Sequence, residues 1–247
     1  MFNADSPITT EKDDLLSRDT FAKQLAKAII SYNQLSSFNI GLYGEWGSGK
    51  TSVINMVEEN IISLTSELTK KPVIIRFNPW LFSDQTQLTI QFFKQLSSAY
   101  KRTNAVKAIG NAMDALGSAF ELISVPIAGT YGGAIAKLVK GIGKGLADKS
   151  PSPDIQKLKD EIAAKLQKEK VKTIIIIDDV DRLSNQEICS VFQLIKSIAD
   201  FPNTIYLLAF DFEVVSRALG KVQNTDGKKY LEKIIQVPFH LPKINEQ

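Results

Sequence analysis

Short apolar runs alternate along this chain with longer stretches in which apolar and polar residues repeat at helical spacing. Four runs rich in β-branched and aromatic residues predict buried strands at residues 38–43, 73–77, 173–177 and 204–210. The third run reads T-I-I-I-I. An unbroken β-branched run is expected of a central parallel strand that is buried on both faces.

The intervening stretches predict amphipathic helices, because their apolar residues recur every three or four positions. Helices are predicted at about residues 86–100, 154–170 and 228–236, with others around residues 21–29, 53–68 and 188–195. Ser17 or Asp19 is expected to cap the first helix. Ser184 and Glu187 are expected to form a capping box, and Gly220 to end the helix after the fourth strand. Alternating strands and helices predict an α/β fold with a mainly parallel central sheet flanked by helices.

The bulk composition is that of an ordinary globular protein, and it excludes several kinds of site. The length of 247 residues fits a single domain, with a polar arm at residues 1–12 and an insertion at residues 101–152. The net charge of +3 gives no whole-protein argument for nucleic-acid binding. One cysteine, Cys189, excludes a disulfide framework, and one histidine, His240, excludes histidine triads and most zinc sites. No signal peptide is recognised, so a cytoplasmic location is expected.

The stretch at residues 101–150 differs in character from the rest of the chain. It holds eight of the fourteen glycines and has a net charge of +4. Its longest uncharged run, residues 122–136, is shorter than the roughly 20 residues that a spanning helix needs. Gly129 and Gly133 have the spacing that lets membrane helices approach closely. A soluble insertion, peripheral contact with the inner face of a membrane and a true span all remain open.

Residues 44–51 read G-E-W-G-S-G-K-T, which matches the phosphate-binding loop pattern G-x-x-x-x-G-K-[ST] at every required position. A predicted strand precedes this loop and a predicted helix follows it, as the pattern requires. Lys50 would contact the β- and γ-phosphates, and the Thr51 hydroxyl would bind Mg²⁺. The residues expected to hold the nucleotide here are Gly44, Glu45, Trp46, Gly47, Ser48, Gly49, Lys50, Thr51 and Ser52.

Two adjacent carboxylates, Asp178 and Asp179, follow the strongest predicted strand. Ligands of parallel sheets bind at the carboxyl ends of the strands, so these side chains are expected at the site. Asp178 would bind Mg²⁺, directly or through water. Asp179 would orient and activate the attacking water. Without a metal, two like charges so close would repel each other.

Three further side chains are candidates for sensing or neutralising the γ-phosphate. Arg182 and Arg217 could each offset its charge, within a chain or across a subunit contact. Arg182 could instead pair with Asp181. Asp211, at the end of the fourth predicted strand, could bond to the γ-phosphate or to water, and it is equally suited to cap the following helix.

The segments 44–51, 77–80, 177–182, 209–211 and 230–236 together resemble the KAP family of P-loop NTPases. This resemblance implies a three-layer ATPase core of the ASCE division, related to STAND and AAA+ proteins. It implies that Asp179 fills the catalytic-acid position, and that residues 15–19, with Arg18, sit near the adenine. Many members carry transmembrane helices between the two nucleotide motifs, where this chain has residues 101–150. Trp80, in the second segment, is expected to pack in the core.

The leading functional hypothesis is a Mg²⁺-dependent switch that slowly hydrolyses ATP and couples its nucleotide state to a partner protein or to self-assembly, in signalling or defence. One alternative is a poorly hydrolysing scaffold that recruits membrane partners through residues 101–150. Another is a nucleic-acid-stimulated motor, which the near-neutral charge disfavours. A GTPase is disfavoured because no N-K-x-D segment is found. A small-molecule kinase remains open, although the paired acids favour water as the acceptor.

Overall fold

The computed structural model describes residues 7–8, 14, 16–34, 36–82, 85–103, 106–124 and 154–241. Within these ranges, five strands form one parallel sheet in the order β2-β3-β4-β1-β5. The strands are β1 (Phe38–Tyr43), β2 (Val73–Phe77), β3 (Thr173–Ile177), β4 (Thr204–Phe210) and β5 (Val237–His240). The first four confirm the predicted apolar runs.

The edge strand β5 was not predicted from the sequence. It has only four residues, includes Pro238, and alternates between half-buried and exposed positions. A short edge strand that tolerates proline lacks the continuous apolar run of a central strand. It pairs with β1, with Val237 opposite Ile40 and His240 opposite Tyr43.

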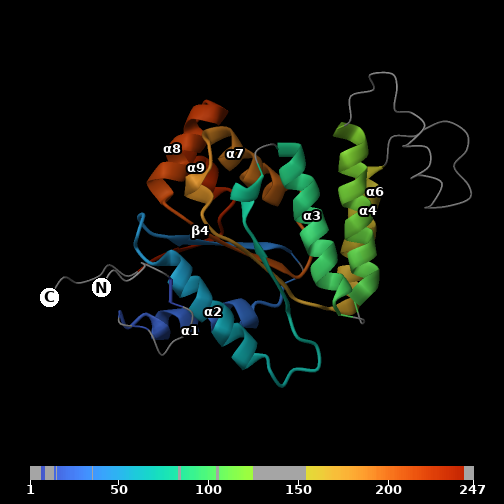
Figure 1. Ribbon diagram of the computed structural model, residues 1–247, viewed down its shortest axis with the longest axis horizontal. Coiled ribbons are helices and arrows are strands. Elements are labelled where there is room, and N and C mark those ends of the chain that lie inside the picture. Colours follow the sequence, from blue (N-terminus) through green and yellow to red (C-terminus); the bar gives the residue numbers. More distant parts are fainter. Residues whose placement is uncertain are drawn as a thin grey trace, which may run out of the picture.

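Helices cover both faces of the sheet, which gives an α/β fold of three layers (Figure 1). One face is covered by α1 (Asp19–Ser31) and α2 (Lys50–Leu64). The other face is covered by α3 (Gln85–Lys101), α7 (Asn185–Gln193), α8 (Phe212–Gln223) and α9 (Gly227–Glu232). Beyond α3 lie α4 (Lys107–Ser124) and α6 (Ile155–Glu169). Two 3-10 turns are η2 (Pro79–Leu81) and η4 (Val180–Arg182), and a π-helical turn, η5 (Leu194–Ile198), follows α7 directly.

The central strand β3 shows why an unbroken apolar run was needed. Ile174 and Ile176 pack with the α1 and α2 layer, whereas Ile175 and Ile177 pack in the core on the opposite face. Successive side chains of a strand point to opposite faces, so a strand covered on both sides needs apolar residues at every position. All five residues of β3 are buried, as predicted.

The capping box of α7 is confirmed, because the Glu187 side chain accepts from the Ser184 N–H and Ser184 Oγ accepts from the Glu187 N–H. The predicted cap of α1 was wrong. Neither Ser17 nor Asp19 caps it, and the Asp14 carboxylate instead accepts from the N–H groups of Arg18 and Asp19.

The predicted end of α8 at Gly220 was also wrong, because the helix continues to Gln223 and Asn224 takes the left-handed conformation with φ of 49°. At Gly220 the helix comes close to the chain that leads into α9. A Cβ there would lie 3.1 Å from the Thr225 carbonyl oxygen. The glycine therefore serves the close approach of α8 and α9.

Part of the predicted insertion is built into the domain. Helix α4 packs against α3 and α6, and its residues Ile109, Met113 and Leu116 are buried. Residues 125–153 lie outside the described residues, and with them most of the uncharged run 122–136. Among the helices that are described, none is long and apolar enough to cross a membrane.

Candidate nucleotide-binding site

The loop between β1 and α2 is shaped by backbone that favours glycine and by one buried arginine. Gly49, directly before α2, has φ of 85°, in the left-handed region that side chains disfavour. A Cβ there would also lie 2.8 Å from Arg18 Nη1. The Arg18 guanidinium donates to the Ser48 carbonyl oxygen and thereby fixes the far side of the loop.

The amine of Lys50 is held over this loop. Lys50 Nζ donates to Gly44 O at 2.9 Å and to Glu45 O at 3.1 Å. It also lies 3.5 Å from Asp181 Oδ2, and both side chains of this ion pair are almost fully buried. Asp181 was not predicted as a site residue. The only available signal was its position at the end of the D-D-V-D segment.

Thr51 and Asp178 meet at the start of α2. Thr51 Oγ1 donates to Asp178 Oδ2 at 2.7 Å, although β4 lies between β1 and β3 in the sheet. Asp178 Oδ1 accepts from the Asp179 N–H at 2.9 Å. A hydroxyl and a carboxylate beside a phosphate-binding loop are the oxygen ligands that Mg²⁺ takes in such proteins. The oxygen atoms of Thr51 and Asp178 are therefore suitable ligands for Mg²⁺.

Asp179 occupies a strained and partly buried position at the carboxyl end of β3. Its φ of 59° is left-handed, a conformation that residues other than glycine adopt uncommonly and that recurs at functional sites. Burial raises the pKa of its carboxyl group, and the negative charges of Asp178 and Asp181 raise it further, while Arg182 and Lys50 oppose this shift. A carboxylate with raised proton affinity is suited to accept a proton.

Arg182 pairs with this acid and contacts two indole rings. Its Nε lies 2.7 Å from Asp179 Oδ1, so the predicted alternative pairing with Asp181 is wrong. Its guanidinium carbon lies 4.6 Å from the centre of the Trp46 ring and 5.6 Å from that of Trp80. Both distances are within the range of a cation–π contact.

Trp80 does not pack in the core as predicted, since 57% of its surface is exposed. The turn η2 explains the difference. Pro79 takes the buried position, and the Asn78 side chain accepts from the Trp80 N–H, so the indole is turned outward toward Arg182.

A cavity of about 770 Å³ opens beside the loop and is large enough for a nucleoside. It lies between the carboxyl ends of β1 and β5 and the start of α8. Its lining residues are Arg18, Tyr43, Gly44, Glu45, Trp46, Gly47, Ser48, Asp211, Phe212, Glu213, His240 and Leu241. Arg18 is thus placed at this cavity and at the loop, and burial lowers its pKa despite the nearby charge of Asp14.

Three aromatic residues of this cavity were not predicted. The Tyr43 ring contacts Phe212 with ring centres 5.0 Å apart and His240 at 5.4 Å. Burial raises the pKa of Tyr43 to about 12, so its hydroxyl stays protonated at neutral pH. Only a fold that brings the ends of β1, β5 and α8 together makes these residues neighbours.

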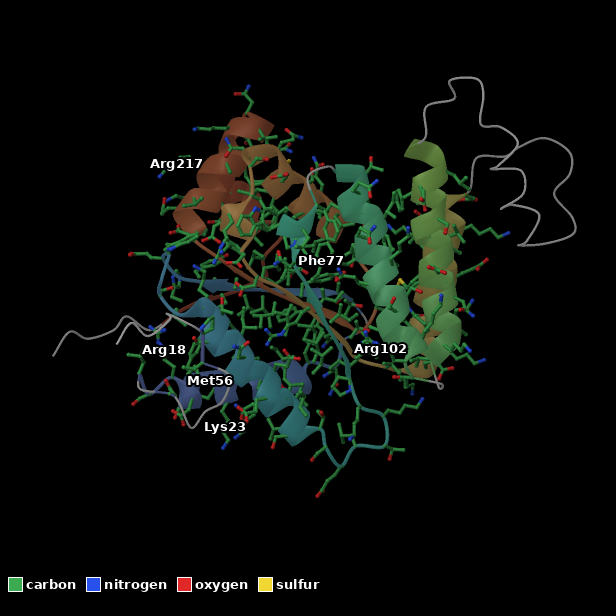
Figure 2. All side chains as sticks on the ribbon, viewed as in Figure 1. Arg18, Lys23, Met56, Phe77, Arg102 and Arg217 are labelled. Atoms are coloured by element: carbon green, nitrogen blue, oxygen red, sulfur yellow. The ribbon has the colours of Figure 1, made fainter. Side chains whose placement is uncertain are left out.

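The remaining predicted site residues have other contacts. The Asp211 carboxylate caps α8 by accepting from two of its N–H groups, while the Asp211 N–H donates to Asp181 Oδ2 at 3.2 Å. Ser52 Oγ accepts from the Ile8 N–H. Arg217 is exposed on the outer side of α8, well away from Arg18 and the loop (Figure 2).

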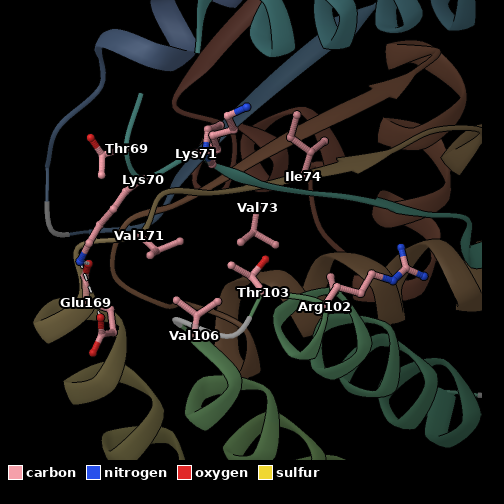
Figure 3. Close-up of a pocket in the computed structure, with 12 residues that line it drawn as sticks. Thr69, Lys70, Lys71, Val73, Ile74, Arg102, Thr103, Val106, Glu169 and Val171 are labelled. Atoms are coloured by element: carbon pink, nitrogen blue, oxygen red, sulfur yellow. Dashed lines mark hydrogen bonds and ion pairs between the residues drawn. The ribbon is translucent and has the colours of Figure 1, made fainter. Parts of the chain in front are cut away.

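A second cavity, of about 450 Å³, lies at the amino ends of β2 and β3, on the edge of the sheet away from the phosphate-binding loop (Figure 3). Apolar residues such as Val73, Val106 and Val171 line it, with Lys70 and Glu169 paired at 3.7 Å on its rim. None of the predicted nucleotide-site residues lines it.

The sequence model of the KAP family P-loop domain matches residues 18–247 of this chain. A relative from Escherichia coli (strain K12), described as phage T7 exclusion protein, is 27% identical over 265 residues. The match takes in 97% of this chain and 34% of the relative, so the chain spans about a third of the length of that relative.

Two solved structures are similar at a lower level. The ORC2 protein of Aeropyrum pernix, in its ADPNP-ADP complexes, is 11% identical with a TM-score of 0.47, over 97% of this chain and 50% of that one. The ORC1 protein of Aeropyrum pernix in complex with DNA is 13% identical with a TM-score of 0.45, over 93% and 46%. Because the family model covers almost the whole sequence, this chain belongs to the KAP family of P-loop NTPases and is a nucleotide-binding domain.

Proposed function

We propose that this domain is a Mg²⁺-dependent ATPase switch that converts ATP and water into ADP and phosphate. Its nucleotide state controls whether it binds a partner protein or assembles with a second copy of itself. The observation that carries the proposal is the hydrogen bond of 2.7 Å between Thr51 Oγ1 and Asp178 Oδ2, beside the amine of Lys50. Two Mg²⁺-type ligands and a phosphate-binding lysine meet at one loop, which is the arrangement of P-loop NTPases.

Each residue has a task in this proposal. Lys50 binds the β- and γ-phosphates, and Thr51 and Asp178 hold Mg²⁺, which supplies positive charge that offsets the charge of the phosphates. Asp179 accepts a proton from the attacking water at its carboxylate. Arg182, whose Nε lies 2.7 Å from Asp179 Oδ1, holds this carboxylate in place.

The nucleoside is assigned to the cavity lined by Arg18, Tyr43, Phe212 and His240. These rings and the buried guanidinium offer stacking surface to a base. ATP is favoured over GTP because the sequence has no N-K-x-D segment for guanine.

A nucleotide panel with purified protein tests the proposal. Binding of ATP, ADP, GTP and GDP is measured by calorimetry with and without Mg²⁺, and native mass is measured in each state. We expect ATP to bind in preference to GTP, and the mass distribution to differ between the ATP and ADP states. Equal affinity for GTP would contradict the choice of base, and absence of any nucleotide binding would contradict the whole proposal.

Two variants separate binding from chemistry. Lys50→Ala should lose ATP binding, because the amine that contacts the phosphates is removed. Asp179→Asn should bind ATP and fail to release phosphate, because an amide does not accept the proton of water at neutral pH. Normal turnover by the Asp179→Asn protein would remove the assignment of the base.

The biological setting that we propose is defence against phage, since a relative that is 27% identical is described as a phage T7 exclusion protein. The test is the plating efficiency of phage T7 on cells that express this protein or its Lys50→Ala variant. Reduced plating that depends on Lys50 is expected. Equal plating on both strains would argue against this role.

A further inference from the structure

The Asp181 carboxylate is a buried charge that the proposed reaction does not use. Its side chain is only 4% exposed. Its Oδ2 atom lies 3.5 Å from Lys50 Nζ and accepts a hydrogen bond from the Asp211 N–H at 3.2 Å. One oxygen atom thus links the lysine of the phosphate-binding loop with the residue that caps α8.

The two sides of the loop indicate which phosphate Asp181 faces. The nucleoside cavity is lined from β1, β5 and the start of α8, and none of Asp178, Asp179 and Asp181 lines it. These three acids belong to the carboxyl end of β3, beside the Mg²⁺-type ligand pair. Mg²⁺ held by Thr51 and Asp178 would offset the charge of the terminal phosphates. The acidic side of the loop is therefore the side of the terminal phosphate.

We infer that Asp181 is a positioning residue through which the site distinguishes ATP from ADP, its ion pair with Lys50 being weakened more when the amine contacts both a β- and a γ-phosphate than when it contacts a β-phosphate alone. This inference rests on the nucleotide site proposed above. A buried ammonium that neutralises a carboxylate must share its charge with an arriving phosphate, and the two anions repel each other. Breaking a buried pair by drawing away one partner is costly, so the charge of Asp181 opposes ATP more than ADP.

The same contact connects the γ-phosphate to α8. When phosphate draws Lys50 away, the Asp181 carboxylate still accepts the hydrogen bond from the Asp211 N–H. Asp211 also holds the first N–H groups of α8 through its side chain, at 2.9 and 3.1 Å. A change in the position of Asp181 therefore reaches the amino end of α8 through a single residue.

The variant Asp181→Asn separates charge from hydrogen bonding, because the amide oxygen still accepts from the Asp211 N–H. Affinities for ADP and for the non-hydrolysed analogue AMP-PNP are measured by calorimetry with Mg²⁺. We expect AMP-PNP to bind at least about tenfold more tightly than to the wild type, and ADP to change by less than about threefold. Equal changes for both nucleotides, or weaker binding of AMP-PNP alone, would overturn the inference.

The matched control is Asp114→Asn, which removes the carboxylate of a different lysine–aspartate pair. Lys101 Nζ and Asp114 Oδ2 lie 3.0 Å apart on the surface between α3 and α4. Both nucleotide affinities should stay at wild-type values. If the wild type itself binds neither nucleotide, the proposed function fails. If the wild type binds both and the Asp181→Asn ratio is unchanged, only the role of Asp181 fails.

A second measurement needs no variant and tests the link from Asp181 to α8 even if Asp181→Asn does not fold. Hydrogen exchange of the wild type is followed with saturating ADP and with saturating AMP-PNP. We expect the first turn of α8, residues 213–216, to differ in exchange between the two states, while α6 does not. Identical exchange of this turn in both states would overturn the link from Asp181 to α8.

Discussion

Arg182 Nε lies 2.7 Å from Asp179 Oδ1, so the carboxylate assigned to activate water is already held by a guanidinium. The same guanidinium lies within cation–π distance of the exposed rings of Trp46 and Trp80. The pKa of the Asp179 carboxyl group is raised by burial and by the charge of Asp178, and it is lowered by Arg182. Arg182 therefore acts on the base through its charge.

Removing that charge should move the pH dependence of turnover. A base works when deprotonated, so activity falls as the pH drops through its pKa. Arg182→Gln removes an opposing positive charge, which raises the Asp179 pKa further and shifts the acidic limb of the kcat profile to higher pH. Phosphate release measured across the acidic range checks this. Arg102→Gln, on the rim of the distant cavity of Figure 3, should leave the limb in place, and an unshifted limb in Arg182→Gln would contradict the coupling.

Thr51 offers a test of the Mg²⁺ site that is independent of turnover. Its hydroxyl donates to Asp178 at 2.7 Å, and hydroxyl oxygen is a ligand that Mg²⁺ accepts. Mg²⁺ should raise the AMP-PNP affinity of the wild type, and in Thr51→Ala this gain should be smaller by a factor of about ten or more, as for the loss of comparable metal-site contacts. Thr51→Ser keeps the hydroxyl and should restore the gain. Binding measured with Mg²⁺ and with a chelator checks both, and a full Mg²⁺ effect in Thr51→Ala would exclude the assignment.

Two glycines of the loop separate backbone strain from crowding. Gly47 has φ of 73° and open space around its position, whereas Gly49 has φ of 85° and the Arg18 guanidinium 2.8 Å from a would-be Cβ. Gly47→Ala should cost about 1–2 kcal/mol of unfolding free energy, the price of a left-handed residue. Gly49→Ala should cost more, because Arg18 would also lose its bond to the Ser48 carbonyl. Urea unfolding of both variants checks the order, and equal costs would show that crowding is unimportant.

The central strands and the loop were predictable because their requirements are local. A strand buried on both faces must be apolar at each position, and Gly49 and Lys50 stand at fixed places in the loop pattern. The pairing of Thr51 with Asp178 followed from their separate motifs, since each motif belongs to the same kind of site.

The contacts that sequence reasoning missed depend on packing between distant segments. Nothing in the spacing of Asp181 shows that its carboxylate meets Lys50 rather than Arg182, because the turn η4 decides which acid faces the loop. The edge strand β5 carries too few apolar residues to stand out. The aromatic lining of the nucleoside cavity forms only when β5 and α8 come beside β1.

Trp80 gives the clearest stability test of a corrected prediction. A tryptophan in the core would cost about 3–5 kcal/mol on truncation to alanine. With 57% of its surface exposed and a cation–π contact to Arg182, Trp80→Ala should cost about 1 kcal/mol or less. Phe92, which is fully buried on α3 and meets Phe77 edge to face, is the matched control, and Phe92→Ala should cost about 3–5 kcal/mol. Urea unfolding of the two variants checks the difference. A cost for Trp80→Ala as large as that for Phe92→Ala would show that the indole is buried in the core.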